Sequence, residues 1–407
     1  MERLVLRGAR LFDGVGDPVA GRAVVVEDGR IASVVSDAQG AAGGGRTLDL
    51  GGLTLLPGLI NCHVHLALGA EADPPRALRE ESPGMTVVKM ITRARHTVES
   101  GVTTVRDLSG REYLELAVRD AVRLGLVPGP RILAAGRGIC MTGGHGWWLG
   151  READGPDEVR RAVREQLKAG VDVIKILASG GVLTPGVDPK SPQLELDEIR
   201  AAVQEARKAG RRTAAHAIAE KAIEHCIEAG ITSVEHGIYL TEALAERMAR
   251  DGVVLVATLS APHAISSGGL GAGIPEFMVR KSDAVRDQHG EAFQIALRHG
   301  VTIAAGNDAG TPLNSHASLV PELALMVKAG MAPLDVVRAA TAVAARTLGL
   351  EHETGRIAPG LAADLLAVGG NPAERIEALG DVRLVIAGGR IVVSRLAGER
   401  RRAEAPR

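Results

Sequence analysis

The stretch Leu56-Pro-Gly-Leu-Ile-Asn-Cys-His-Val-His-Leu66 is a short apolar run that leads into two histidines one residue apart. Alternate side chains of a β-strand point to the same side, so His63 and His65 are expected to project together from the carboxyl end of a strand. Imidazole is the commonest metal ligand among side chains, and the pair therefore predicts a chelating arrangement. Cys62 directly precedes His63, but its side chain should point away from both histidines, which argues against a role as ligand.

Composition sets broad limits on the class of protein. The chain has 407 residues, which suits one large barrel with a small accessory domain. Its formal net charge of −1 lacks the excess of positive charge that is typical of proteins that bind nucleic acid or an anionic membrane. Neither a signal-peptide pattern nor an apolar span of about 18 residues is present, so we expect a soluble cytoplasmic protein. The three scattered cysteines predict reduced, buried thiols: Cys62, Cys140 and Cys226.

Both ends of the chain carry β-branched runs separated by glycine turns, without helical segments between them. The amino-terminal runs are Arg3–Arg7, Ala23–Glu27 and Arg30–Val35, and the carboxyl-terminal runs are Ala363–Val368, Val382–Ala387 and Gly388–Val393. We expect the two ends to meet in one small β-sandwich domain made of residues 1–57 plus 359–400.

Between these ends, short β-branched runs alternate with longer segments of helical period, such as Asp157–Ala169 and Asp197–Ala209. Eight candidate strands follow one another: Leu55–Cys62, Val102–Asp107, Arg131–Ala135, Val171–Leu177, Thr213–Ala217, Ser233–Glu235, Val253–Thr258 and Thr302–Gly306. This rhythm predicts an α/β fold, a (β/α)8 TIM barrel over residues 58–358. The working face of such a barrel is the carboxyl end of its strands.

Side chains that can bind a metal stand at the ends of four of these strands and inside a fifth. They are His63, His65, Lys175, His216, His236 and Asp308. Each alone is compatible with a core, turn or ion-pair residue, but their joint occurrence at one end of a barrel predicts a metal site. A lysine buried in an apolar strand should have a lowered pKa, and its neutral amine can add carbon dioxide to become a carbamate.

A carbamate has two oxygens and can bridge two metals about 3.5–4 Å apart. The ligands then divide between two divalent ions, with His63, His65 and Asp308 on one and His216 and His236 on the other. Carbamylated Lys175 and a hydroxide bridge the pair. Nitrogen and oxygen ligands suit zinc, while manganese, cobalt and iron stay open.

With this constellation the chain resembles the amidohydrolase superfamily. The likeness spans nearly the whole chain and includes Gly355-Arg-Ile-Ala-Pro-Gly-Leu-Ala-Ala-Asp364, which is similar to the superfamily's return into the sandwich. The resemblance implies hydrolysis by metal-bound hydroxide, in which Asp308 takes a proton from the hydroxide and passes it to the leaving group. It also implies a small-molecule substrate, and its members are often homo-oligomers.

A finer resemblance rests on three motifs, namely Val173-Ile-Lys-Ile-Leu-Ala-Ser-Gly-Gly181, Val234-Glu-His-Gly-Ile-Tyr239 and Met141-Thr-Gly-Gly-His-Gly146. They are similar to the binuclear prolidase-like branch, which includes Xaa-Pro dipeptidases, carboxypeptidases that release basic residues, and ochratoxin-type amidases. The resemblance places His145 and Tyr239 near the scissile carbonyl or the substrate's carboxylate. Arg106 and His316 are further candidates for binding that carboxylate.

The function predicted from these residues is cleavage of the C-terminal amide of dipeptides or N-acyl amino acids. Another amide, carbamate, urea or lactam, including xenobiotics, is the alternative on the same site. Ring opening or purine-type deamination is disfavoured because those branches generally use one metal without the strand lysine. Some relatives are assembly proteins that have lost ligands, whereas all six stand here. Trp147 and Trp148 could line the pocket or a subunit interface.

Overall fold

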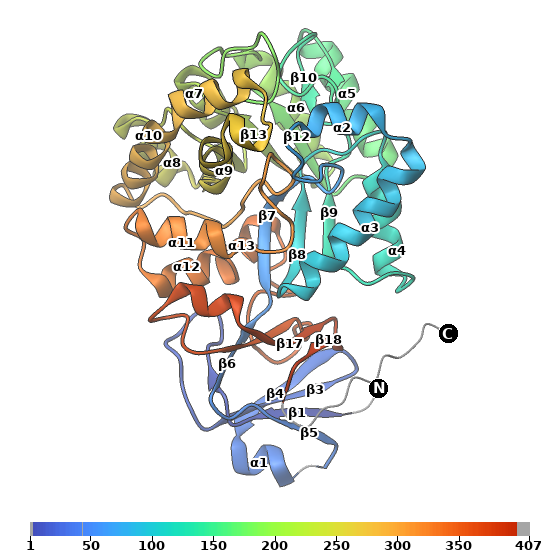
Figure 1. Cartoon of the computed structure of the whole chain (residues 1–407), viewed down its shortest axis with the longest axis vertical. Helices are drawn as coiled ribbons and strands as arrows, with labels where there is room; N and C mark the ends of the chain where they lie inside the picture. The colour runs from blue at the N-terminus through green and yellow to red at the C-terminus, as the bar shows by residue number, and fades with distance from the viewer. Residues whose placement is uncertain (1–2, 43, 397–407) are drawn as a thin grey trace.

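The computed structural model describes residues 3–42 and 44–396 and contains two groups of β-strands (Figure 1). The first group forms two sheets at the lower end of the view, with orders β4-β3-β1-β5 and β18-β17-β16-β6-β2. Their strands are β1 (Leu4–Arg7), β2 (Arg10–Leu11), β3 (Arg22–Glu27), β4 (Arg30–Ser36), β5 (Arg46–Asp49), β6 (Leu53–Pro57), β16 (Leu365–Gly369), β17 (Val382–Ala387) and β18 (Arg390–Ser394). The short helices α1 (Asp37–Ala42) and η2 (Ile376–Gly380) accompany them.

Strands from both ends of the chain belong to this group. β6 from the amino-terminal segment pairs antiparallel with β16 from the carboxyl-terminal segment, beginning with Pro57 opposite Leu365. Buried side chains from both sheets, such as Leu6 and Leu384, belong to one hydrophobic cluster. This pairing brings together residues more than 300 positions apart in the chain.

The second group consists of parallel strands whose carboxyl ends lie on the same side. One sheet has the order β7-β8-β9, and the other contains β10-β12-β13-β14-β15 with β11 at its edge. The strands are β7 (Leu59–Val64), β8 (Val102–Asp107), β9 (Arg131–Ala134), β10 (Ile139–Cys140), β11 (Arg151–Glu152), β12 (Val173–Leu177), β13 (Arg212–Ala217), β14 (Ser233–His236) and β15 (Val254–Val256). Most are buried along their whole length, as expected for strands covered on both faces.

Helices surround these parallel strands in Figure 1. They are α2 (Pro74–Glu80), α3 (Pro83–Glu99), α4 (Leu114–Arg123), α5 (Pro156–Ala169), α6 (Leu196–Lys208), α7 (Glu220–Ala229), α8 (Glu242–Asp251), α9 (Ser260–Gly268), η1 (Leu270–Ala272), α10 (Glu276–Arg298), α11 (Val320–Lys328), α12 (Pro333–Ala339) and α13 (Ala342–Leu348). The alternation of strand and helix gives a mixed α/β fold of the TIM-barrel type. The parallel sheets are joined by single contacts instead of one continuous ladder, for example from the Asp172 amide to the Ala134 carbonyl at 2.9 Å.

Two predicted strands need correction. The run Leu55–Cys62 is not one strand, because the chain passes from β6 into β7 at Gly58. A Cβ at Gly58 would lie 2.2 Å from the Thr103 side chain, so only glycine fits this crossing. The predicted eighth strand, Thr302–Gly306, forms only an isolated bridge to β15 at Ile303.

The eighth segment forms no regular ladder because its backbone bonds are shared among three neighbours. Ala304 donates to the Leu255 carbonyl at 3.0 Å and Ala305 donates to the Ala339 carbonyl at 3.0 Å. The Ala305 carbonyl accepts from the Cys62 amide of β7 at 2.9 Å. The segment still lies between β15 and β7, which places Asp308 beside the end of β7.

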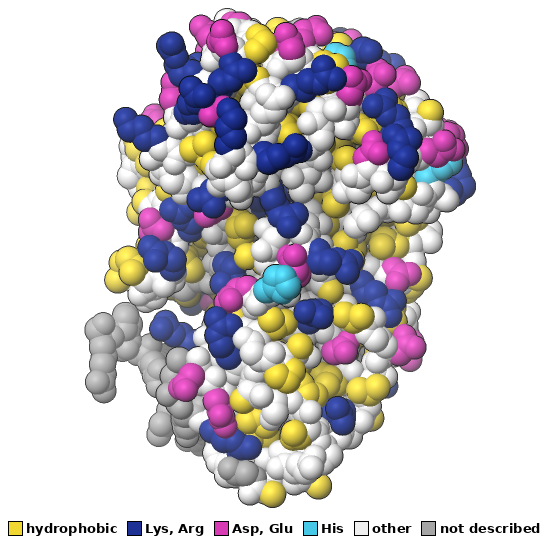
Figure 2. Space-filling view, turned by 180° about the vertical axis from the view of Figure 1, so that it is seen from behind, with side chains coloured by type: hydrophobic (Ala, Val, Ile, Leu, Met, Phe, Trp, Pro, Cys, Tyr) yellow, Lys and Arg dark blue, Asp and Glu magenta, His cyan; other side chains and the backbone are white. Residues whose placement is uncertain are grey.

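On the face shown in Figure 2, basic and acidic side chains are interspersed and do not gather into a patch of one sign of charge. This mixture agrees with the near-zero net charge. Within the described ranges, the helices lack the combination of length and hydropathy needed to cross a bilayer. The three cysteines are free and buried, as predicted, and burial raises the pKa of the Cys62 thiol to about 12.

Candidate metal centre and substrate pocket

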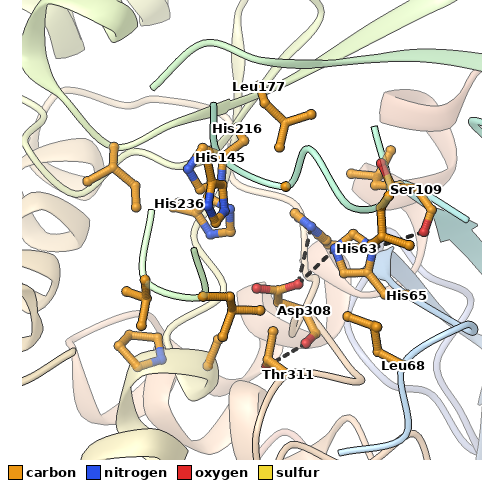
Figure 3. A pocket seen from close by; sticks show the side chains of 18 of the residues that line it. His63, His65, Leu68, Ser109, His145, Leu177, His216, His236, Asp308 and Thr311 are labelled. Atoms are coloured by element: carbon orange, nitrogen blue, oxygen red, sulfur yellow. Dashed lines mark hydrogen bonds and ion pairs between the residues drawn. The ribbon is translucent and has the colours of Figure 1, made fainter. Parts of the chain in front are cut away.

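Three predicted ligands converge at the end of β7. The Nε2 atoms of His63 and His65 lie 3.4 and 3.2 Å from Oδ1 of Asp308. Figure 3 shows these three side chains pointing toward one another from separate parts of the chain. One ligand atom from each lies within 4.8 Å of the others, a spacing that can hold a metal ion. His63 and His65 thus lie on the same side at the end of one strand, where they could bind one metal ion together with Asp308.

A hydrogen bond to the buried carboxylate of Glu235 fixes the orientation of His63. Nδ1 of His63 lies 2.9 Å from Oε2 of Glu235, which leaves Nε2 directed toward Asp308. Arg106 donates to Oε1 of Glu235 at 2.8 Å and to the Cys62 carbonyl at 2.7 Å. Such carboxylate–histidine contacts set the tautomer and ring position of metal ligands.

The backbone bends sharply where ligands leave their strands. His236 and Asp308 have φ values of 70° and 56°, and Thr258 at the end of β15 has a φ of 56°. Such left-handed positions cost non-glycine residues about 1–3 kcal/mol each and are maintained by surrounding structure. Here they turn the side chains toward the common end of the parallel strands.

A second group of histidines lies opposite the first (Figure 3). The rings of His216 and His236 are 4.6 Å apart between centroids, and His236 lies 5.2 Å from His63. Nε2 of His216 contacts the Gly180 carbonyl at 2.9 Å, and Nδ1 of His236 contacts the Thr258 hydroxyl at 2.7 Å. Each ring thus keeps its other nitrogen available for a metal ion.

Lys175 of β12 lines the same cavity as the two groups, and it is buried at 3% exposure. Its Nζ has no hydrogen-bond partner among the described residues, and the same holds for Oδ1 of Asp308. Burial lowers the pKa of Lys175 to about 8, although the carboxylates of Glu235 and Asp308 act in the opposite direction. An unpartnered buried amine is costly, which indicates that a further group completes its environment.

The protonation states of the ligands also fit divalent ions. Burial, with Lys175 nearby, lowers the pKa of His63 to about 4, and burial holds the pKa values of His216 and His236 well below the ordinary range. Their imidazoles are therefore neutral near pH 7 and offer lone pairs. Burial alone would raise the pKa of Asp308, but His63 and His65 outweigh it and keep the carboxylate ionised. The residues present thus fit a metal centre.

These ligands stand at the base of a cavity of about 810 Å³, which includes space open to solvent. All six predicted ligands line it, together with His145. The ring of His145 lies 4.5 Å from that of His216, and its Nδ1 contacts the Thr184 hydroxyl at 3.0 Å. His145 therefore lies on the cavity wall beside His216.

The other three residues expected near a substrate carboxylate do not stand on the cavity wall. Arg106 lies behind His63, where Glu235 occupies its guanidinium. Nε2 of His316 contacts the Leu68 carbonyl at 2.9 Å. Tyr239 packs against Ile218, Ile238 and Val285, which line the cavity, and Nζ of Lys190 lies 4.9 Å from its ring centroid. These positions are explained by buried contacts that the sequence alone does not show.

Sequence reasoning missed several other wall residues. His289 of α10 lines the cavity, and its Nε2 lies 3.2 Å from the His236 carbonyl. No local pattern marks it, because it lies within a long helix far from the strand ends. The sequence left open whether Trp147 and Trp148 line the pocket or a subunit interface. Trp148 lines the cavity, whereas Trp147 is 45% exposed.

The parallel α/β fold thus brings a His/Asp cluster that could hold a metal ion to the ends of its strands. A family model described as the amidohydrolase family matches residues 54–392. The chain belongs to the amidohydrolase family.

Individual relatives narrow this assignment. An ochratoxinase of Aspergillus niger is 31% identical over 415 residues, which cover 94% of this chain and 84% of the relative. A structure of a Xaa-Pro dipeptidase with bound methionine is 31% identical with a TM-score of 0.89, covering 96% of this chain and 99% of the other. A prolidase structure complexed with N-methylphosphonate-L-proline has 31% identity and a TM-score of 0.89, covering 97% and 100%. The predicted prolidase-like branch is confirmed, and the protein is a hydrolase that acts on amide bonds.

Replacing Arg106 by Met should destabilise the protein, because Glu235 would keep a buried charge without its strongest partner. Breaking a buried pair of this kind typically costs about 3–5 kcal/mol. Urea unfolding measures the change. The matched control is Arg76→Met, which removes an arginine from the exposed pair with Glu80 and should leave the free energy of unfolding nearly unchanged. Equal stability of both variants would show that the Arg106–Glu235 pair does not support the site.

Proposed function

We propose that the protein is a metal-dependent amidohydrolase that cleaves the C-terminal amide of dipeptides or N-acyl amino acids. The observation that carries the proposal is the convergence of His63, His65 and Asp308 beside the unpartnered amine of Lys175. The similarity to a Xaa-Pro dipeptidase, a prolidase and an ochratoxinase supports an amino acid as the leaving group.

We assign two divalent ions, zinc being the best match to the ligands. His63, His65 and Asp308 would hold one, and His216 and His236 the other. Lys175 would bridge them after its neutral Nζ bonds to the carbon of carbon dioxide and releases a proton, which turns a donor into two acceptor oxygens. When bound, such a pair supplies a hydroxide nucleophile and polarises the scissile carbonyl.

The chain's own groups then perform the proton transfer and the orientation. Asp308 is ionised at neutral pH, so Oδ1 can accept a proton at the nucleophile and release it to the leaving nitrogen. His145 is neutral because burial lowers its pKa to about 3, and one ring N–H can donate to a substrate oxygen. Its contact with Thr184 fixes the ring for that role.

The architecture also supports a division of labour between two domains. We propose that residues 1–57 plus 359–400 form the sandwich domain and residues 58–358 form a closed (β/α)8 barrel that carries the site. Residues 1–2, 43 and 397–400 of these ranges lie outside the described part of the chain. The passage from β6 to β7 at Gly58 supports the first boundary.

The substrate's free carboxylate should matter for turnover. With Arg106 and His316 occupied elsewhere, His145 and the metal centre remain to bind it. Amidating the carboxylate of N-acyl-proline or of a dipeptide should lower kcat/KM by about one to two decades, since a lost charge-assisted hydrogen bond costs roughly 1.5–3 kcal/mol. Steady-state kinetics on the matched pair test this. Equal rates would reject the amino-acid leaving group and favour another amide, carbamate or urea.

A further inference from the structure

The segment after β12 forms a loop whose neck is closed by backbone contacts. Gly180 donates to the Ser191 carbonyl at 2.8 Å, and Ser179 and Pro192 form an isolated bridge. The tip of this loop, residues 181–187, reaches over the cavity, and its Val182 and Leu183 side chains line it. The tip is one wall of the pocket, lying beyond the regular strands.

Lys281 of α10 holds this tip in place. Its Nζ donates to the carbonyls of Gly181 at 3.2 Å and Thr184 at 2.6 Å, and also to that of Val187. A lysine ammonium has three donors, so the tip uses all of them. Three carbonyls of the tip, two near its ends and one at its middle, thus bind a side chain of α10, about 100 positions further along the chain.

The tip in turn contacts the polar side of the pocket. The Thr184 hydroxyl bonds with Nδ1 of His145 and accepts from the Gly146 amide, both at 3.0 Å. A Cβ at Gly181 would lie 2.4 Å from Nε2 of His145, so the backbone fits closely around this ring. Moving the tip would therefore shift both His145 and the wall formed by Leu183.

The wall beside the tip is apolar. Leu183 clusters with Ile265 of α9 and Met278 of α10, and Trp148 packs against the same cluster. Apart from histidines, the acidic and basic side chains that line the cavity are Lys175 and Asp308, both assigned to the metal centre. An α-ammonium of a dipeptide would find no free carboxylate there and would face the metal ions, which makes its burial costly.

We propose that Lys281 is a positioning residue that fixes the 181–187 tip as one wall of an acyl subsite and so makes the enzyme prefer bulky, apolar, uncharged acyl groups. The inference rests on the proposed function, which supplies the substrate's amino-acid half. It adds that N-aroyl or similar N-acyl amino acids are better substrates than dipeptides with a free amino group.

The experiment compares N-benzoyl-L-proline, N-acetyl-L-proline and alanyl-proline on the metal-loaded full chain. Equilibrium affinity is measured by calorimetry, and kcat and KM are measured separately. The wild type should bind the benzoyl compound more tightly than the other two. Lys281→Met should lose about ten- to hundredfold of this preference, with a smaller change for the acetyl compound and unchanged metal content. Hydrogen exchange of residues 181–187 should rise in the variant.

Arg280→Met is the matched control, because it removes an exposed cation from the neighbouring position of the same helix. Leu183→Ala tests the wall independently and should also reduce the benzoyl preference. A wild type without benzoyl preference, an unchanged preference in Lys281→Met or in Leu183→Ala, or unchanged exchange of the tip would overturn the inference. Selective binding without hydrolysis would instead reject the proposed function and leave the subsite standing.

Discussion

Lys175→Ala should lower kcat by more than about a hundredfold. A residue that only orients a metal ligand typically contributes ~10–100-fold to affinity or activity, and the loss of a ligand itself should cost more. The structure gives the reason, since Nζ is buried without any hydrogen-bond partner among the described residues, and Lys175 lines the same cavity as both groups of histidines. Removing the side chain removes the group that we assign as the bridge. The measurement is kcat with the N-acyl-proline substrate, together with metal content.

Rescue by a small acid distinguishes a lost ligand from a damaged fold. Acetate or propionate can enter the space left by Lys175→Ala and supply the missing oxygens, so activity should partly return as the acid is added. Lys168→Ala, which changes an exposed lysine of α5, is the control and should behave as the wild type. Normal turnover and metal content in Lys175→Ala would show that the lysine is structural.

Asp308→Asn should bind substrate but turn it over poorly. The change removes the ionised carboxylate whose Oδ1 lies next to Nε2 of both His63 and His65. General acid–base groups contribute about 10²–10⁴-fold, and the weakened metal contact adds to the loss. Single-turnover kinetics, with substrate affinity measured in parallel, separate the effect on chemistry from the effect on binding.

The control for this variant is Asp283→Asn on the exposed face of α10, which should keep full activity. An Asp308→Asn enzyme that retains most of its kcat would assign the proton transfer to another group. His145 would then be the next residue to test, because it lines the same cavity.

The common location of the candidate ligands was predictable because strand periodicity is a local property. His63 and His65 alternate on one strand, and His216 and His236 each end an apolar run, so their common location follows from the parallel arrangement alone. The β-strands at the two chain ends were predictable in the same way, from β-branched runs without intervening helices. The irregular backbone of Thr302–Gly306 was not predictable, since it depends on hydrogen bonds to Leu255, Cys62 and Ala339 that no local pattern reveals.

Residues that support the ligands were harder to foresee. Glu235 and Arg106 are 129 positions apart, and only the assembled fold shows that they pair beneath His63. Arg106 therefore looked available for substrate when read from sequence. The apolar wall was hard to foresee for the same reason, because Lys281 and the 181–187 tip meet only through tertiary contacts. Loops carry specificity, and their positions are set by such contacts.

The central claim is that six strand-end residues hold two divalent ions that the reaction requires. The most direct test is elemental analysis of protein produced with added zinc and purified without chelators, with activity measured on the same sample. The account predicts close to two ions per chain, loss of activity on chelation and its return when metal is restored. Full activity in rigorously metal-free protein would contradict it.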